Sequence, residues 1–144
     1  MTEKLITEMT LPECQRLLEQ HHFGRLAFID QVEARPMILP VNYLLHQGKV
    51  VFRTDPGAKL APALTGAPVA FEVDGIQAHD RVGWSVVVLG HLQEVTDRAE
   101  IDLLSQTPLI PWAPGPKQHY VRVDPDRLSG RRISVADLPS PWWG

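Results

Sequence analysis

The chain has 144 residues, of which 44% are hydrophobic and 22% are charged, with a formal net charge of −3 at pH 7. This balance is typical of an ordinary folded domain, and the negative charge argues against a broad nucleic-acid-binding surface. One cysteine allows neither an intrachain disulfide nor a paired-cysteine metal motif. With no apolar run near the ~20 residues that span a bilayer and no signal-like start, we expect a single cytoplasmic domain over residues 1–144, without a membrane segment.

The first predicted element is a short helix that begins after Thr10. Thr10 and Glu13 have the spacing of a capping box, in which the threonine side chain accepts a hydrogen bond from the backbone N–H three residues later. Cys14, Leu17 and Leu18 fall on one face of this helix. We therefore expect that face to pack against the core, and Cys14 to serve packing rather than nucleophilic chemistry.

Alternating hydrophobic residues then predict three strands, Arg25–Asp30, Pro36–His46 and Val50–Thr54. One face of the second strand carries Met37, Leu39, Val41, Tyr43 and Leu45. Gln47-Gly48-Lys49 is a tight-turn sequence, so the third strand should return antiparallel beside the second.

The second half of the chain predicts further strands and one helix. The expected strands are Val69–Asp74, Trp84–Leu89, His119–Val123 and a last one that begins with Gly130-Arg131-Arg132-Ile133. Trp84–Leu89 is apolar on both faces, so its outward residues need to be covered by a helix or by a second subunit. Asp97 and Glu100 have the spacing of a second capping box, and Ile101 and Leu104 share one side of the helix that follows.

Six or seven short strands with hairpin turns and few helices favour a mainly β fold, a small antiparallel β-barrel. A dinucleotide-binding Rossmann fold is disfavoured because the chain has no glycine-rich fingerprint between a strand and a helix. The phosphate loop of nucleotide hydrolases is also absent.

The end of the third strand has the features of an anion site. Arg53 and Thr54 end the strand, Asp55 and Pro56 are suited to start a helix, and Lys59 lies in its first turn. A helix N-terminus offers unpaired N–H donors, to which the arginine adds bidentate geometry and the lysine a point charge. The pattern predicts a phosphate site, and the alternative is an ordinary strand–turn–helix with solvated basic residues.

The order of several motifs resembles that of a known family. The motifs are Leu39-Pro40-Val41-Asn42-Tyr43, Val51-Phe52-Arg53-Thr54 with Gly57 and Lys59, Val69-Ala70-Phe71-Glu72-Val73-Asp74, Gly83-Trp84-Ser85-Val86-Val87-Val88-Leu89-Gly90, and Tyr120-Val121-Arg122-Val123 with Gly130-Arg131-Arg132-Ile133. Over nearly the whole chain they resemble pyridoxamine 5′-phosphate oxidase-like FMN-binding split-barrel proteins, and most closely the short branch near nitroimidazole-resistance-type proteins. The resemblance implies a six-stranded antiparallel Greek-key-type split barrel with a few short flanking helices, and a homodimer that holds FMN in grooves at the subunit interface.

The resemblance also implies where the cofactor binds. The cofactor-binding positions that match are Pro40, Val41, Asn42, Phe52, Arg53, Thr54, Lys59, Leu60, Trp84 and Ser85. Arg53, Thr54 and Lys59 would hold the flavin phosphate, and the backbone through Pro40 would run along the ring. Pro40 has the alternative of an edge or bulge position. Trp84 has the alternative of simple core packing.

The implied function is that of an FMN-dependent oxidoreductase acting on an unidentified small molecule. No catalytic side chain is expected, because a flavin carries the hydride chemistry itself. The alternatives are a deazaflavin F420-dependent reductase, a non-enzymatic flavin- or haem-binding protein, and an interaction module without a cofactor. The histidines form no metal-binding pattern, although His46, His79, His91 or His119 would be the candidates for a haem ligand.

Overall fold

The computed structural model describes residues 6–54, 60–77, 79, 82–109 and 119–134. Its elements are β1 (Ile6–Glu8), α1 (Leu11–Gln20), β2 (Phe23–Asp30), β3 (Arg35–His46), β4 (Lys49–Thr54), the 3₁₀ helix η1 (Ala61–Leu64), β5 (Thr65–Gln77), β6 (Val82–Glu94), α2 (Arg98–Ser105) and β7 (His119–Ser134). The predicted helix start at Asp55 and Pro56, with Lys59, lies outside the described residues. Neither helix in the described ranges is long and apolar enough to cross a membrane.

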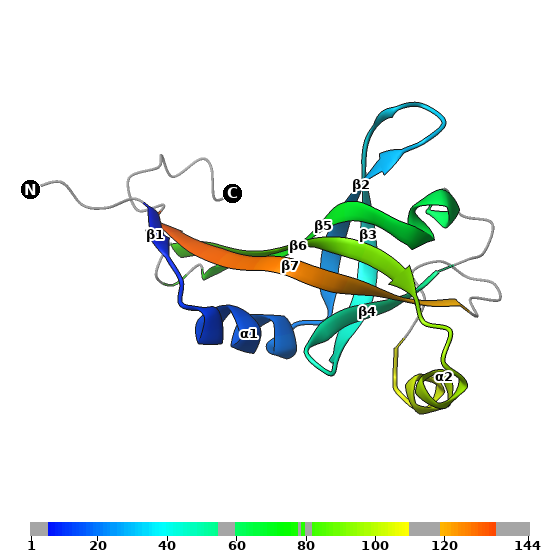
Figure 1. Ribbon diagram of the computed structural model, residues 1–144. Helices are drawn as coiled ribbons and strands as arrows, with labels where there is room; N and C mark the ends of the chain where they lie inside the picture. The colour runs from blue at the N-terminus through cyan, green and yellow to red at the C-terminus, as the bar shows by residue number, and fades with distance from the viewer. Residues whose placement is uncertain (1–5, 55–59, 78, 80–81, 110–118, 135–144) are drawn as a thin grey trace, which may run out of the picture.

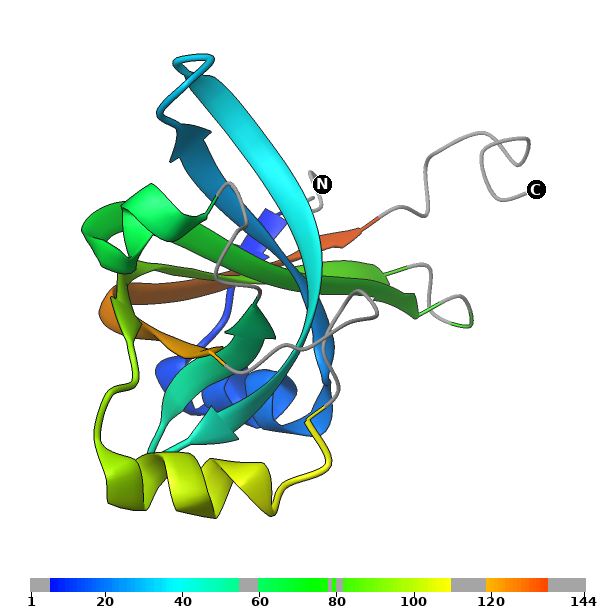
Figure 2. The same ribbon diagram turned by 90° about the vertical axis from the view of Figure 1, so that its right-hand side faces the viewer.

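The strands form one antiparallel sheet that closes on itself as a barrel. The strand order is β1-β7-β4-β3-β2-β5-β6, and β6 also pairs with β7, which closes the circuit of six strands. The short β1 is added to the far end of β7. Figure 1 shows α1 and α2 at separate places on the outside of the barrel, and Figure 2 shows the ends of β2 and β3 projecting beyond it. The predicted mainly β split-barrel fold is confirmed.

The predicted strand patterns hold, with one correction. The five apolar side chains predicted to share a face of β3 all belong to the main core or pack against it. The two predicted strands at His119–Val123 and Gly130–Ile133 are in fact one continuous strand, β7. Asp124-Pro125-Asp126 resembles a turn in sequence, but a register shift opposite Leu89 and Gly90 accommodates it as a β-bulge. Proline is tolerated at a bulge because no ladder hydrogen bond needs its missing N–H.

The predicted turn and caps are present. Gln47 and Gly48 both have positive φ, 54° and 77°, as a two-residue hairpin turn with the twist of its strands requires. The backbone N–H of Glu13 donates to the Thr10 hydroxyl at 3.3 Å, and that of Glu100 donates to the Asp97 carboxylate at 3.0 Å. These caps start α1 and α2 where the sequence predicts.

Two hydrophobic clusters stabilise the fold. The main cluster fills the barrel around Tyr43, Phe52 and Phe71, each no more than 1% exposed. The rings of Tyr43 and Phe71 meet edge to face, with centroids 4.8 Å apart. The second cluster, which we call the α2 cluster, lies between α2 and the outer side of the sheet, and it consists of Val51, Val95, Leu104, Leu109 and Tyr120.

Candidate functional site

The predicted phosphate-binding strand ends on the border between the two clusters. Side chains alternate along β4, so Phe52 and Thr54 lie on the barrel side, where both are buried. Val51 belongs to the α2 cluster, and Arg53 is on the same outer face. The two predicted neighbours Arg53 and Thr54 therefore point to opposite sides of the sheet.

Arg53 is held on the outer face by the α2 cluster. Its Nη1 donates to the backbone carbonyl of Leu109 at 3.5 Å. The guanidinium carbon lies 5.4 Å from the centroid of the Tyr120 ring, within the range of a cation–π contact. These contacts position the guanidinium beside the segment that follows α2, on the face of the sheet that also carries Asn42.

A groove of about 560 Å³ lies next to Arg53, on the outer side of β3. It is lined by His22, Asn42, Tyr43, Leu44, Leu45, His46, Thr107, Pro108 and Leu109. Leu109 is both a wall of the groove and the acceptor for Arg53. The Thr107 hydroxyl donates to the carbonyl of Leu104 at 2.6 Å, which ties this wall to the end of α2. The groove therefore offers an apolar lining with a few polar groups, as ligand sites commonly do.

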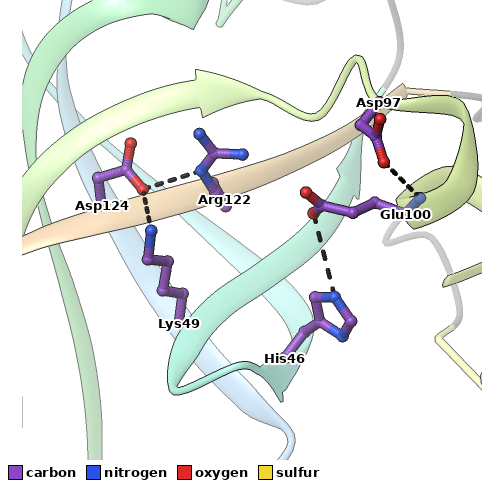
Figure 3. Close-up of polar contacts among 6 residues, drawn as sticks. All are labelled: His46, Lys49, Asp97, Glu100, Arg122 and Asp124. Carbon is purple, nitrogen blue, oxygen red and sulfur yellow. Dashed lines mark hydrogen bonds and ion pairs between the residues drawn. The ribbon is translucent and has the colours of Figure 1, made fainter. Parts of the chain in front are cut away.

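His46 connects the groove to α2. Its Nε2 lies 4.0 Å from a carboxylate oxygen of Glu100, an ion pair that exists only when the imidazole is protonated (Figure 3). The backbone N–H of the same Glu100 is bonded to Asp97, the cap of α2. Sequence reasoning considered His46 only as a haem ligand and Glu100 only as part of a cap, because nothing in a sequence pattern places α2 over the end of β3.

A second charged group lies beside this region. Asp124 accepts from Lys49 at 3.1 Å and from Arg122 at 2.8 Å (Figure 3). Partial burial by itself would raise the pKa of Asp124, but the hydrogen bonds and charges of the two cations outweigh it and lower that pKa. One carboxylate is thus shared between two basic side chains.

The remaining predicted site residues divide between the core and the far side of the barrel. Val41, Phe52 and Leu60 are buried in the main cluster. Trp84 is 8% exposed, and its ring centroid is 4.9 Å from that of His21. Strands β2 and β5 separate Trp84 and its neighbour Ser85 from β3.

Pro40 lies in β3 opposite Arg25, before the first position that pairs with β4. Among the described residues, that stretch of β3 pairs with β2 alone, so the edge position considered for Pro40 is the one observed there. The structure brings together Asn42 and Arg53, whose strands pair at the adjacent Tyr43 and Phe52. The cofactor roles of all these residues stay predictions, and Lys59 lies outside the described residues.

Among the residues that the structure describes, no three His, Cys, Asp or Glu side chains are grouped as a metal site would require. Three of the histidines considered as haem ligands have other surroundings. His91 pairs with Asp126 at 2.8 Å, His119 pairs with Glu94 at 3.0 Å, and His79 is exposed. His46 is the one of these four candidates that lines the groove.

Comparison with known proteins identifies a family. The family described as pyridoxamine 5′-phosphate oxidase matches residues 10–132. The uncharacterized protein Rv0080 of Mycobacterium tuberculosis is 36% identical over a 141-residue alignment that covers 94% of this chain and 90% of that protein. The solved structure of the FAD binding protein from Mycobacterium smegmatis is 33% identical, with a TM-score of 0.74 over 88% of this chain and 98% of that one.

A more distant structure shares the fold alone. It is a candidate 5-nitroimidazole antibiotic resistance protein from Bacteroides thetaiotaomicron, which is 12% identical, with a TM-score of 0.66 over 91% of this chain and 95% of that one. The predicted family is confirmed by the match over residues 10–132.

Proposed function

The chain belongs to the pyridoxamine 5′-phosphate oxidase family, and we propose that it is a cytoplasmic flavin-binding oxidoreductase that acts on a small molecule. One observation carries the proposal: a groove lined by Asn42 lies beside Arg53 on the same face of the barrel. Asn42 and Arg53 are both among the cofactor-binding positions that the family resemblance implies. The M. smegmatis structure, which is that of an FAD binding protein, supports a flavin as the cofactor.

The residues present fit a flavin. Leu44 and Leu109 offer the groove apolar surface for a planar ring, and Asn42 offers an amide for a ring carbonyl or nitrogen. Arg53, at the border of the groove, offers a guanidinium suited to bidentate phosphate binding. FMN is the cofactor predicted from sequence, and FAD carries a phosphate at the same place on its ribityl chain. Arg53 would therefore serve either one.

When bound, the flavin supplies the hydride chemistry, and the protein positions and shields it. Asn42 would orient the ring edge, and Leu44 and Leu109 would exclude water from one ring face. Tyr43 lines the groove from β3, while its phenol lies in the main cluster inside the barrel, where burial raises the pKa of that phenol. Its hydroxyl is already committed, since it donates to the carbonyl of Leu18 at 2.6 Å.

We further propose that the protein is a homodimer formed through the outer face of the sheet. An apolar row, Ile38, Ala27, Ala70 and Leu89, crosses β3, β2, β5 and β6 at directly paired positions. Ile38 is 67% exposed and Leu89 is 40% exposed. Monomeric proteins rarely expose a contiguous apolar surface of this kind to water. A symmetric copy would cover this row.

Sedimentation tests the dimer. The protein should sediment at about twice the chain mass of 16.1 kDa at micromolar concentration. Ala70→Glu places a charge in the middle of the apolar row and should give monomers, whereas Val32→Glu, at a 90% exposed position elsewhere, should not. A monomeric parent, or an Ala70→Glu protein that stays dimeric, would contradict this interface.

Flavin binding to Arg53→Ala tests the phosphate role. The variant should lose about 1.5–3 kcal/mol of FMN binding free energy, the range for hydrogen bonds to charged groups. Riboflavin, which has no phosphate, should bind both proteins equally. Arg131→Ala, an exposed arginine at the other end of β7, is the matched control. Equal weakening of both ligands would show structural damage, and no weakening of either would remove Arg53 from the site.

The absorption spectrum and a reduction assay test the rest of the proposal. The purified protein should show an oxidised flavin band that bleaches with a nicotinamide or a chemical reductant and returns with an acceptor. Acid release and chromatography then decide between FMN and FAD. A deazaflavin or a haem spectrum would replace the flavin assignment, and a flavin that cannot be reduced would leave only a binding function.

A further inference from the structure

A second hollow, of about 770 Å³, lies at one end of the barrel, which we call the barrel-end hollow. Its walls are α1, the turn between β3 and β4, and the middle of β7, which Figure 1 shows close to one another. It differs from the groove beside Arg53, because the groove opens on the outer face toward α2. Among the described residues, Leu45 alone lines both.

The floor of the barrel-end hollow is the hydrophobic core itself. Leu18, Val50, Val88 and Val123 line it, and all four belong to the main cluster inside the barrel. All four are no more than 4% exposed, so the accessible apolar surface of the hollow comes from the half-buried Leu45 and Leu128 beside them. Leu11, which is 58% exposed, adds an apolar side chain at the edge. Such a surface gains free energy when an apolar molecule covers it.

The β7 wall of the hollow is shaped by the β-bulge. Leu89 pairs with Arg127 and Gly90 pairs with Pro125, so Asp126 is the extra residue on β7. A Cβ at Gly90 would collide with the carbonyl oxygen of Asp124, so the bulge needs glycine on the opposite strand. Bulges redirect side chains and occur often beside functional sites. Here the residues at and after the bulge line the hollow.

The charges around the hollow are balanced. Lys49 is engaged with Asp124 (Figure 3), and Asp126 is paired with His91. Two further lining residues of opposite charge, Glu19 on α1 and Arg127 on β7, make no ion pair among the described residues. The rim therefore offers hydrogen-bonding groups but no excess of either charge. Because a buried charge needs a partner, such a site favours an uncharged ligand.

We propose that the barrel-end hollow is a binding site for an uncharged, largely apolar small molecule, separate from the groove beside Arg53. Its volume lies within the roughly 300–1,000 Å³ typical of small-molecule sites. The apolar body of the ligand would lie on Leu11, Leu45 and Leu128, and its polar edge would face the rim.

Fluorescence titration with 1-N-phenylnaphthylamine, a neutral apolar probe, tests the proposal on the purified full-length protein. The probe should bind with a rise in emission, and the anionic probe 8-anilinonaphthalene-1-sulfonate should bind at least about tenfold more weakly. Gln15→Trp, at an exposed lining position on α1, should fill the hollow and weaken the neutral probe about tenfold. Leu128→Trp should do the same from the β7 wall.

Leu103→Trp, at a 55% exposed position on α2, is the matched control and should leave probe binding unchanged. Added FMN should not displace the probe, and Gln15→Trp should keep the parent's FMN affinity. The proposal is overturned if the neutral probe does not bind, if both filling variants bind it like the parent, if the anionic probe binds as tightly, or if FMN displaces the probe.

Discussion

The two hydrophobic clusters of this protein differ in what surrounds them. The main cluster, with Tyr43, Phe52 and Phe71, lies inside the barrel and is surrounded by its six strands. The α2 cluster is a thin layer between one helix and the outer face of the sheet, and it borders Arg53 and the groove. Val51 and Phe52 are consecutive in sequence, yet they belong to different clusters because side chains alternate along a strand.

Because of this difference, we expect substitutions in the main cluster to affect stability alone and substitutions in the α2 cluster to affect cofactor binding as well. A substitution in the main cluster removes packing contacts that the surrounding strands cannot replace, so it should lower the free energy of unfolding. A substitution in the α2 cluster also loosens the wall formed by Leu109, which holds Arg53 and lines the groove. The four predictions that follow test the separation, from the largest expected effect to the smallest.

Phe71→Ala should have the largest effect on stability. Phe71 is fully buried, packs on Tyr43, and also lies where a Cβ on Gly24 would collide with it. Truncation should lower the unfolding free energy by about 3–5 kcal/mol, measured by urea denaturation. Phe23→Ala, at a 46% exposed position, should cost less than half as much. Equal costs for the two would show that the barrel interior is not the main source of stability.

Leu104→Ala should have a smaller effect on stability and a clear effect on the site. Leu104 is 1% exposed, and its removal should cost about 2–3 kcal/mol of unfolding free energy, the low end for leucine because a thin layer can relax. FMN affinity should fall as well, since the segment after α2 loses its support. Leu103→Ala, at the exposed neighbouring position, should change neither quantity. A normal FMN affinity in Leu104→Ala would separate the α2 cluster from the site.

Tyr43→Phe should cost about 1 kcal/mol, because the Leu18 carbonyl loses its hydrogen-bond donor. It should also change the response to alkali. Burial raises the pKa of the Tyr43 phenol above the usual value of about 10, so the unfolded chain ionises first. The contribution of Tyr43 is therefore complete below about pH 10 and is lost as the pH rises above it. Denaturation curves at several alkaline pH values should fall less steeply with pH for Tyr43→Phe than for the parent.

Removing either helix cap should have an effect on stability as small as that of Tyr43→Phe. Thr10→Ala and Asp97→Ala should each cost about 1 kcal/mol of unfolding free energy, the usual value of an N-cap side chain. The two variants should differ in FMN affinity, because Asp97 caps the helix that carries Glu100 toward His46 and Thr10 caps the helix on the other side. Equal FMN affinities in both variants would show that fraying of α2 does not reach the groove.

Local patterns were sufficient to predict most elements of the fold. The alternation in β3, the two N-caps and the Gln47-Gly48 turn each depend on residues within a few positions of one another, and all are present. The family likeness also depends on ordered local motifs, and it is confirmed. The split of β7 into two predicted strands was wrong because Pro125 resembles a turn residue unless its bulge partner, Gly90, is known to lie opposite.

The sequence by itself determined which residues alternate, cap and turn, because these preferences come from the backbone and its nearest neighbours. Only the tertiary structure decided that the Arg53 guanidinium lies over the Tyr120 ring and donates to the carbonyl of Leu109. The tertiary structure likewise decided that two strands separate Trp84 from Asn42. It also decided that Glu100 faces His46 and that α1 and β7 enclose a hollow. Contacts of this kind join residues far apart in the chain, and the closing of the barrel, rather than any local pattern, brings them together.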